Sequence, residues 1–244
     1  MASVTKAFTI LSCVSRAGGQ GLAFAEIVRQ TGFPKASTHR LLKEMVEIGA
    51  LIFDLPTKNY RCGLLLARLG AGVTAGYDIR TTVRSHLEHL QKITGQVATL
   101  GVINGHEGVY IDKVEGSDFG IRLHSEIGKA FPLHATAMGK ILLAYGEDAN
   151  FEAIVAKKLT AFTDKTITRR ATLKAECQKV REQGFAIDNE EITRGLICIA
   201  APIFGVDGKC VGAISCTSPT YILDDGTVDT IKSAIIKQAA KASA

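Results

Sequence analysis

Basic and small polar side chains gather on one face of a helix that the sequence predicts near its N-terminus. Gly32 is a residue type that ends helices, and Pro34 suits the first turn of the next, so we expect a helix to begin at Pro34. The helical period of its apolar residues places Leu41, Met45 and Ile48 on one buried face. A helix that reads the major groove of DNA needs exposed basic and small polar groups in its N-terminal half. The candidate DNA contacts here are Lys35, Ala36, Ser37, Thr38, His39, Arg40 and Lys43.

The same pattern also suits an ordinary amphipathic helix with a solvated face, so the neighbouring elements matter. Two helices are expected before it, at 4–17 and at 24–31. A hairpin is expected after it, because the apolar run 50–53 is followed by a turn with Pro56 and by a returning strand at 60–62. Helices and a hairpin in this order predict a winged helix-turn-helix.

The excess of positive over negative charge is confined to the first third of the chain. Residues 1–76 hold nine Lys and Arg against four Asp and Glu, whereas the rest of the chain holds 20 of each kind. A basic module joined to a neutral domain is typical of nucleic-acid-binding proteins. Within the predicted hairpin, Lys58 and Arg61 are candidates for phosphate contacts beside the groove. Double-stranded DNA is therefore an expected partner, and a single winged helix would need a second copy to read a pseudo-palindromic site.

A second group of polar residues, further along the chain, suits the binding of a small molecule. The predicted helix 134–145 begins with residues of little bulk, so its free N–H groups and dipole favour an anion such as a carboxylate. Ser215 and Thr217 are two apart on a predicted strand, so both hydroxyls face one side of a sheet. Asp188 lies at the end of one predicted strand, and Cys198 lies at the start of another. The open alternative is that these groups are satisfied locally within the sheet.

Strands and helices alternate along this part of the chain. Asn104-Gly105 is a strong signal for a hairpin turn, and Val206-Asp207-Gly208 predicts another. The alternation predicts an α+β fold with an antiparallel sheet flanked by helices. The expected helices are 79–94, 134–145, 149–158, 173–183 and 228–240, and the expected strands are 96–103, 109–114, 120–124, 185–188, 197–204 and 210–217.

The boundary between the two parts is expected at a short linker helix. The run Leu64-Leu65-Leu66 is too apolar for a solvated linker, so we expect it to pack against a second copy or against the neighbouring domain. Gly70, Gly72 and Gly76 should loosen the chain after it. The expected domains are a winged helix-turn-helix at 1–62, a linker helix at 63–77 and a second domain at 78–244.

Several function classes are disfavoured by the sequence. No apolar run reaches the length needed to span a membrane, and the N-terminus lacks the pattern of a secretory signal, so we expect a cytoplasmic protein. The six cysteines form no C-x-x-C pair, which favours reduced thiols over disulfides or a zinc site. His86 and His89 are expected to be exposed helix residues, and no motif indicates a cofactor.

Three segments together resemble the IclR family of bacterial transcriptional regulators. They are GFPKASTHRLLKEMVEIGAL followed by YRCGLLLARLG, then PLHATAMGKILLA, and finally DNEEITRGLICIAAPIFGVDGKCVGAISCTSP. The resemblance covers almost the entire chain. It implies an N-terminal winged helix-turn-helix, a C-terminal GAF-like effector-binding domain, and assembly as a homodimer or a dimer of dimers. The implied function is a ligand-responsive, DNA-binding regulator of a catabolic operon.

The resemblance also implies which residues contact the effector, for which a small organic acid is expected. The implied contacts are Ala137, Met138, Asp188, Leu196, Cys198, Ser215 and Thr217, with Phe131 and Leu123 as apolar wall.

Two alternatives from other classes remain open. Asp188, Glu190 and Glu191 are carboxylates that could do acid–base chemistry, and Cys198 could be a nucleophile. No motif supplies a histidine partner, and no phosphate-binding or hydrolase signature occurs, so Glu190 and Glu191 are expected to bond loop backbone N–H groups instead. The other alternative is that the winged helix binds a protein, with a small-molecule-binding or cysteine-dependent enzyme domain fused to it.

Overall fold

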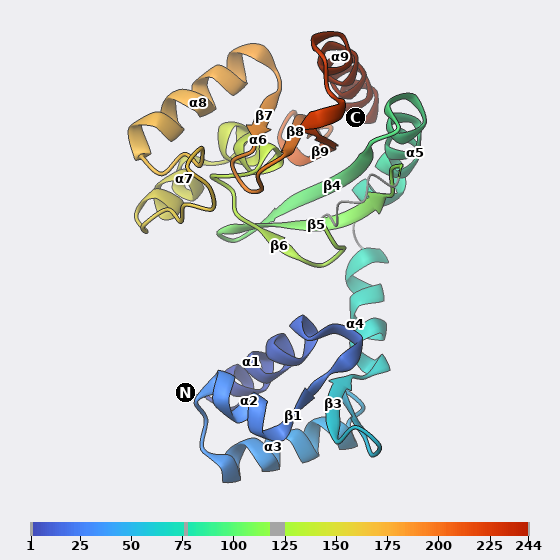
Figure 1. The fold of residues 1–244 in the computed structure, drawn as a ribbon, viewed down its shortest axis with the longest axis vertical. Helices are drawn as coiled ribbons and strands as arrows, with labels where there is room; N and C mark the ends of the chain where they lie inside the picture. Colours follow the sequence, from blue (N-terminus) through green and yellow to red (C-terminus); the bar gives the residue numbers. More distant parts are fainter. Residues whose placement is uncertain (1, 76–77, 118–124, 244) are drawn as a thin grey trace. The chain divides into compact units, whose positions relative to one another are not determined.

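The computed structural model describes residues 2–75, 78–117 and 125–243, and it divides the chain into two compact units. The N-terminal unit is Met1–Gly76 and the C-terminal unit is Tyr77–Ala244. Figure 1 shows the elements of each unit. The predicted strand 120–124, with Leu123, lies outside the described residues.

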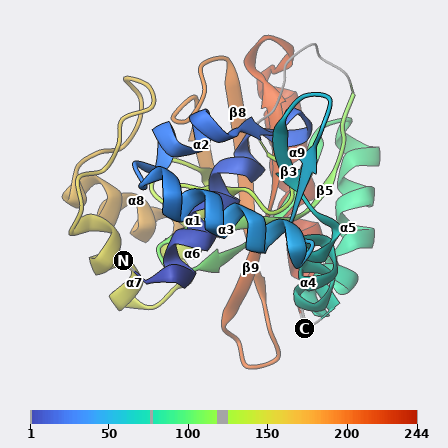
Figure 2. The same ribbon diagram turned by 90° about the horizontal axis from the view of Figure 1, so that it is seen from below.

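The N-terminal unit is a helical core with a small sheet at one side. Its elements are α1 (Ser3–Arg16), a 3-10 turn (Gly18–Gln20), β1 (Leu22–Ala23), α2 (Phe24–Thr31), α3 (Lys35–Glu47), β2 (Leu51–Asp54), β3 (Asn59–Cys62) and α4 (Leu64–Ala75). Ile10, Val14, Ile27 and Leu42 are fully buried between α1, α2 and α3. Helix α3 lies on the outer side of this unit, in front of α1 and α2 in the view from below (Figure 2).

The hairpin β2–β3 forms a three-stranded antiparallel sheet with β1, in the order β1-β3-β2. Leu22 pairs with Tyr60, so the strand before α2 is tied to the hairpin after α3. The sequence did not predict β1, because two residues carry no period of their own. The helices, the tight turn and the wing follow in the expected order.

Three details of the N-terminal unit differ from the sequence predictions. Pro34 is the N-cap residue, in an extended conformation, and α3 begins at Lys35. Ile48 is not on the buried face, because the helix ends before it and 64% of its surface is exposed. The apolar stripe expected for the first helix includes Val4 and Phe8, but these residues are 68% and 64% exposed, so the buried stripe of α1 is made by its later turns.

Helix α4 lies within the range 63–77 that was expected for the linker helix. It continues through Gly70 and Gly72, which were expected to loosen the chain, and ends at Ala75, while Gly76 lies outside the described residues. Gly63 precedes it at a point of close approach, since a Cβ atom there would lie 2.1 Å from the carbonyl oxygen of Gly49. A side chain at position 63 would therefore push the start of α4 away from the turn between α3 and β2.

The C-terminal unit is built on one six-stranded antiparallel sheet in the order β6-β5-β4-β9-β8-β7. One face is covered by α5 and α9, and the other by α6 and α8 (Figure 1). The elements are α5 (Asp78–Thr94), β4 (Val97–Asn104), β5 (Glu107–Val114), β6 (Ala130–Phe131), α6 (Ala137–Tyr145), α7 (Asp148–Val155), α8 (Arg170–Gln183), β7 (Ala186–Asn189), β8 (Leu196–Phe204), β9 (Cys210–Pro219), a 3-10 turn (Thr220–Ile222) and α9 (Asp225–Ala242).

The strand period sorts side chains between the two cores of this unit. Ile214 and Cys216 of β9 are buried in the core under α5 and α9, whereas Ser215 between them faces α6, as expected. The α+β prediction is confirmed, and so is a hairpin turn after Asn104, although the two turn residues are Gly105 and His106. The short strand β6 was not predicted.

Two predictions about histidines are corrected. His134 precedes α6, which begins only at Ala137, and its Nε2 lies 2.9 Å from the carbonyl oxygen of Thr160. His86 is half-buried, with Nδ1 2.9 Å from Oε1 of Gln238, because α9 packs against α5. His89 is exposed, as expected.

Candidate functional site

The polar face of α3 is exposed along the length that the sequence indicated. Lys35, Ala36, His39, Arg40 and Lys43 are exposed, and Ser37 is half-buried. These residues share one side of the helix because Leu41, Leu42 and Met45 are buried on the other. The arrangement leaves three cations and a histidine free to meet a nucleic acid.

Thr38 does not belong to this exposed face. Its side chain is fully buried, and its hydroxyl donates to the carbonyl oxygen of Pro34 at 3.1 Å. Position 38 lies three residues before Leu41 and four before Leu42, so it shares their inward direction. The prediction that Thr38 contacts DNA is therefore wrong in this structure, and the residue stabilises the first turn of α3 instead.

The cations of α3 are held only loosely. Arg40 lies 3.7 Å from Glu44, and Lys43 lies 3.8 Å from Glu47, one turn further along in each case. Exposed pairs of this kind contribute at most about 1 kcal/mol, so they cost little to break. Both side chains can therefore leave their carboxylates for a phosphate or a base edge.

The wing presents its two predicted cations differently. Lys58 is exposed at the turn, where its φ of 53° puts the backbone in the left-handed region. Arg61 is exposed on β3 and lies 3.3 Å from Asp54 on the facing strand. A hollow separates the wing from α3, with the Phe53 and Tyr60 rings 4.9 Å apart at its wall. His39 and Lys43 of α3 line the same hollow.

In the C-terminal unit, the first turn of α6 offers backbone donors. Thr136 is the N-cap residue, and its hydroxyl accepts from the N–H of Gly139 at 3.1 Å and donates to the carbonyl of Pro132 at 2.9 Å. First-turn N–H groups have no acceptor within their own helix. Thr136 accepts from the N–H of Gly139, and among the described residues the N–H groups of Ala137 and Met138 find no acceptor, so they remain for a ligand. Both residues are buried.

Strands β4 and β9 place two hydroxyls opposite this turn. Thr99 pairs with Ser215 in register, and their hydroxyl oxygens are 2.7 Å apart. The Thr99 hydroxyl also lies 3.8 Å from the sulfur of Met138. Ser215 is thus brought to Met138 through Thr99, a residue that sequence reasoning missed because it lies on a distant strand.

A second cluster contains Asp188, Cys198 and Thr217. Cys198 is opposite Asp188 on β7 and opposite Thr217 on β9, and its sulfur lies 3.2 Å from the Thr217 hydroxyl. Burial, followed by the charge of Asp188, raises the pKa of the Cys198 thiol well above its usual range. The thiol therefore stays protonated, which argues against Cys198 as a nucleophile. Leu196 is buried two residues before it.

Asp188 is a buried carboxyl with only 1% of its surface exposed. Its Oδ1 accepts from the N–H of Glu191 at 2.7 Å. Burial raises the pKa of Asp188 to about 7, and this outweighs the bond from Glu191 and the nearby ammonium of Lys140, which both lower it. Near neutral pH the carboxyl is therefore poised between donor and acceptor forms.

Phe131 is buried on β6, where its ring packs 4.6 Å from that of Tyr110. The ring lies over Gly101 and Gly108, and a Cβ atom at Gly108 would come within 2.1 Å of it. Phe131 is thus an apolar wall on the α6 side of the sheet. Leu123, the other expected wall residue, lies outside the described residues.

The expected bonding of both glutamates to loop backbone is corrected for Glu190, whereas the Glu191 carboxyl does meet the backbone N–H of Ile167. Glu190 does not use its side chain on loop backbone but lies 3.3 Å from Lys165 and 3.8 Å from Arg194. Glu191 forms a short contact with the buried ammonium of Lys140. Sequence reasoning missed Lys140, although a lone lysine within the apolar run Ala137–Tyr145 was a signal that could have been followed.

Within the described ranges, no group of three or more His, Cys, Asp or Glu residues is placed to hold a metal ion. No helix among the described residues is long and apolar enough to cross a membrane.

Two family models together cover nearly the whole chain. Residues 71–244 match the bacterial transcriptional regulator IclR C-terminal domain, and residues 3–54 match the IclR helix-turn-helix domain. The chain belongs to the IclR family. Its described structure agrees with the fold of that family, a helix-turn-helix joined to an α+β domain with an antiparallel sheet. The IclR-family protein is therefore a transcriptional regulator with a DNA-binding and an effector-binding domain.

Named relatives and solved structures support this assignment over full length. The HTH-type transcriptional regulator XynR of Escherichia coli is 34% identical over 224 residues, which are 91% of this chain and 88% of that protein. An IclR transcriptional regulator from Alicyclobacillus acidocaldarius superposes with a TM-score of 0.85 at 26% identity, covering 99% of this chain and 97% of the other. An IclR homologue from Microbacterium hydrocarbonoxydans, solved with 4-hydroxybenzoate, shares the fold at 20% identity, a TM-score of 0.80 and coverage of 99% and 100%.

Proposed function

We propose that this IclR-family regulator controls a catabolic operon in the cytoplasm and responds to a small organic acid. In this proposal residues 1–62 bind DNA, 63–77 link the units and 78–244 bind the effector. The observation that carries the choice of effector is the first turn of α6, where the buried residues Ala137 and Met138 have N–H groups without an acceptor in the part of the chain that the structure describes. Backbone N–H groups at a helix N-terminus favour a carboxylate without any cationic side chain.

The effector's carboxylate would meet Ala137 and Met138, and its other end would reach the second cluster. Asp188, Cys198 and Thr217 supply polar groups there, while Phe131 and Leu196 are apolar. Ser215 would give up its hydrogen bond to the Thr99 hydroxyl and bind the effector instead. An anion is tolerated in such a buried place only where several donors converge.

A thermal-shift screen of small carboxylates tests this proposal, with each acid compared with its neutral amide. An acid should raise the melting temperature of the protein and its amide should not, because the helix N-terminus rewards the negative charge. If amides stabilise the protein as well as acids do, the carboxylate site is wrong. The genes next to that of the regulator would narrow the panel of acids.

On DNA, the exposed face of α3 would read bases while the wing meets phosphates. Arg40 and His39 stand at mid-helix, where base edges are reached, and Lys58 and Arg61 lie on the hairpin beside the groove. We propose the same contacts for Lys35, Ala36, Ser37 and Lys43. A single reader of this size covers few base pairs, so a pseudo-palindromic operator and two copies are part of the proposal.

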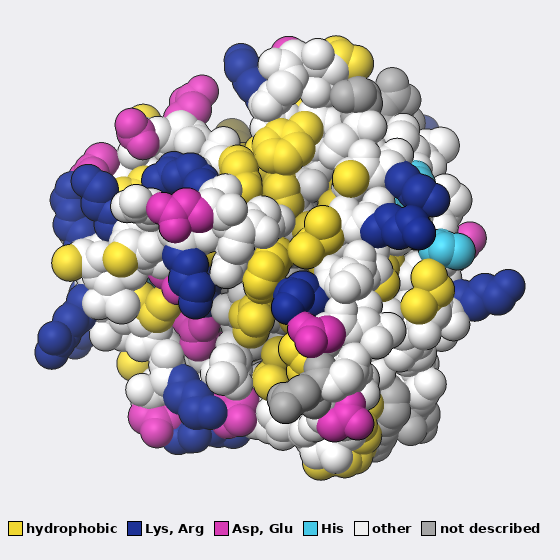
Figure 3. Space-filling model, turned by 90° about the horizontal axis from the view of Figure 1, so that it is seen from above, with side chains coloured by type: hydrophobic (Ala, Val, Ile, Leu, Met, Phe, Trp, Pro, Cys, Tyr) yellow, Lys and Arg dark blue, Asp and Glu magenta, His cyan; other side chains and the backbone are white. Residues whose placement is uncertain are grey.

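Exposed apolar residues support an assembly through the N-terminal unit. Leu64 and Leu69 of α4 are 78% and 61% exposed, and Phe8 of α1 is 64% exposed. A band of apolar side chains also crosses one face of the C-terminal unit, with lysine and arginine side chains on both sides of it (Figure 3). Such surface favours a homodimer, or a dimer of dimers if both faces are used. A sedimentation experiment that finds only monomer at micromolar concentration, alone and on DNA, would contradict this.

The alternative of a cysteine-dependent enzyme receives no support from the site. The Cys198 thiol is kept protonated by burial, and its close partner is a threonine hydroxyl rather than a base. A protein-interaction role for the winged helix would be favoured only if duplex DNA failed to bind at low salt, where phosphate contacts are strongest.

A further inference from the structure

Lys140 is a charged residue in the interior of the C-terminal unit. It lies on α6, one turn after Ala137, and only 1% of its surface is exposed. Its neighbours in the helix are apolar residues of the core. A buried ammonium is costly unless it is paired and hydrogen-bonded, so its partners have to be placed with care.

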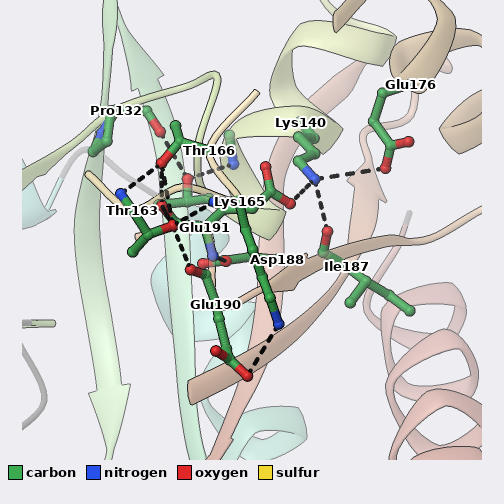
Figure 4. A network of polar contacts seen from close by, with 12 residues as sticks. Pro132, Lys140, Thr163, Lys165, Thr166, Glu176, Ile187, Asp188, Glu190 and Glu191 are labelled. Atoms are coloured by element: carbon green, nitrogen blue, oxygen red, sulfur yellow. Dashed lines mark hydrogen bonds and ion pairs between the residues drawn. The ribbon is translucent and has the colours of Figure 1, made fainter. Parts of the chain in front are cut away.

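Three segments supply those partners, as Figure 4 shows. Lys140 donates to the carbonyl oxygen of Ile187 on β7 at 2.8 Å and forms a short contact with Glu191 in the loop after β7. Glu176 of α8 lies 3.6 Å away. In the described sheet β7 is an edge strand. The Lys140 ammonium therefore gives the Ile187 carbonyl oxygen the hydrogen bond that a further strand would otherwise donate.

Asp188 lies between the two anchor points of this lysine. Ile187 immediately precedes it, and Glu191 both binds Lys140 and donates its backbone N–H to the Asp188 carboxyl at 2.7 Å. The position of Asp188 therefore depends on Lys140, which binds Ile187 on one side of it in the chain and Glu191 on the other. The same lysine belongs to helix α6, whose first turn contains Ala137 and Met138.

The outer side of the loop is fastened separately. The Thr163 hydroxyl donates to the Glu190 carbonyl at 2.8 Å, and the Thr166 hydroxyl donates to that of Glu191 at 2.6 Å. Lys165 pairs with the Glu190 side chain at 3.3 Å, and its side chain is 41% exposed. Lys165 thus forms a lysine–carboxylate pair with the same loop that Lys140 binds (Figure 4), but its side chain is partly exposed whereas that of Lys140 is buried.

We propose that Lys140 is a positioning residue of the effector site: its ammonium fixes segment 187–191 and thereby sets Asp188 opposite the first turn of α6. The inference rests on the proposed effector site, in which Ala137, Met138 and Asp188 meet the ligand. Lys140 itself touches no ligand, because its three partners occupy the ammonium. It acts by joining the two ligand-binding segments.

The charges around Asp188 make this role measurable. Asp188 is faced by Lys140 of α6, Glu191 of its own loop, Cys198 of β8 and Tyr110 of β5. Burial raises the pKa of Asp188 most, the charge of Glu191 raises it further, and the ammonium of Lys140 lowers it. Loss of the lysine charge should therefore raise the pKa of Asp188, and loss of the Glu191 charge should lower it.

The test uses full-length protein with ¹³C-labelled aspartate carboxyl groups and follows their titration by NMR. The Asp188 signal is identified by its absence in Asp188→Asn. Lys140→Met should raise the Asp188 midpoint by about one pH unit or more, because the nearest cation is lost. Hydrogen exchange of segment 187–191 should become about tenfold faster or more. The matched control Lys165→Met should move neither quantity.

A folded Lys140→Met protein with the wild-type Asp188 midpoint and wild-type exchange would overturn the inference. If Lys140→Met does not fold, Glu191→Gln decides the matter, since it keeps the size of the side chain and removes its charge. Faster hydrogen exchange of segment 187–191 in Glu191→Gln supports the anchoring by Lys140, and wild-type exchange contradicts it. Neither measurement needs an effector, so a failed carboxylate screen would count against the proposed function alone.

Discussion

The two units of this protein handle charge in opposite ways. In the N-terminal unit the cations of α3 are exposed, and their carboxylate partners lie 3.7 and 3.8 Å away in loose pairs. In the C-terminal unit Lys140, Asp188 and Glu191 are almost completely buried, and each has a close partner. Exposed cations can exchange their carboxylate partners for the phosphates of DNA, because their pairs are weak. Buried charges such as Lys140 keep their partners and so hold the proposed effector site in one geometry.

The largest expected effect comes from removing one carboxylate in each unit. Glu191→Ala should lower the free energy of unfolding by about 3 kcal/mol, because it leaves a buried ammonium with one distant carboxylate. Glu47→Ala, which breaks the loose pair with Lys43, should cost less than about 0.5 kcal/mol. Denaturant titrations of both variants provide the measurement. Equal losses of unfolding free energy in the two variants would show that the buried and the exposed ion pairs stabilise the protein equally.

A smaller effect, on the affinity for DNA, is expected from substitutions of the exposed cations in the N-terminal unit. Arg40→Ala should weaken binding to the specific site by about 1–3 kcal/mol and relax the preference at one base pair. Lys58→Ala should instead weaken binding to all sequences alike and reduce the salt slope by about one. Fluorescence anisotropy on duplexes selected from a random library measures both. Unchanged affinity and selectivity in Arg40→Ala would exclude α3 as the reader.

The buried side of the comparison predicts a dependence of stability on pH. Burial raises the pKa of Asp188 from 3.8 to about 7, so between these values the folded protein binds the proton more tightly than the unfolded chain does. The contribution of Asp188 to stability is therefore full at low pH and declines as pH rises toward 7, by at most about 1.4 kcal/mol per unit. Asp188→Asn should flatten this part of the profile. Thermal melts from pH 5 to 7 that are identical in both proteins would contradict the assignment.

The smallest expected effect concerns the hydroxyls of β9. Ser215→Ala combined with Thr217→Val should weaken binding of the best acid from the carboxylate screen by about tenfold, the value of one or two hydrogen bonds. Ligand-free DNA binding should stay unchanged, because the substituted residues belong to the other unit. Calorimetry of the full-length variant gives the dissociation constant. A wild-type constant would place the effector elsewhere.

The elements with local signals were predicted well from the sequence. Helix α2 was expected at the residues where it occurs, because Gly32 takes the left-handed conformation that ends it, with φ of 67°. The two faces of β9 follow from alternation alone. The exposed cations of α3 follow from its helical period. The strand alternation and the helical period both depend only on residues close in the chain.

What could not be predicted depends on partners far away in the sequence. Strand β1 exists because β3, nearly forty residues later, pairs with it. Thr99 joined the site only through its register with Ser215, and Lys140 only through Glu191 and Ile187. Thr38 was misplaced because a threonine suits either face of a helix, and only packing decides between them.

The contact between Gly63 and Gly49 has a consequence for building chimaeric regulators. Gly63 must stay without a side chain because a Cβ there would lie 2.1 Å from the carbonyl oxygen of Gly49, and Gly49 is favoured by its own backbone, whose φ is 76°. A fusion that takes the wing from one parent and α4 from another would separate the two halves of this contact. Exchanged DNA-binding units should therefore be cut after α4, so that both glycines are inherited from the same parent.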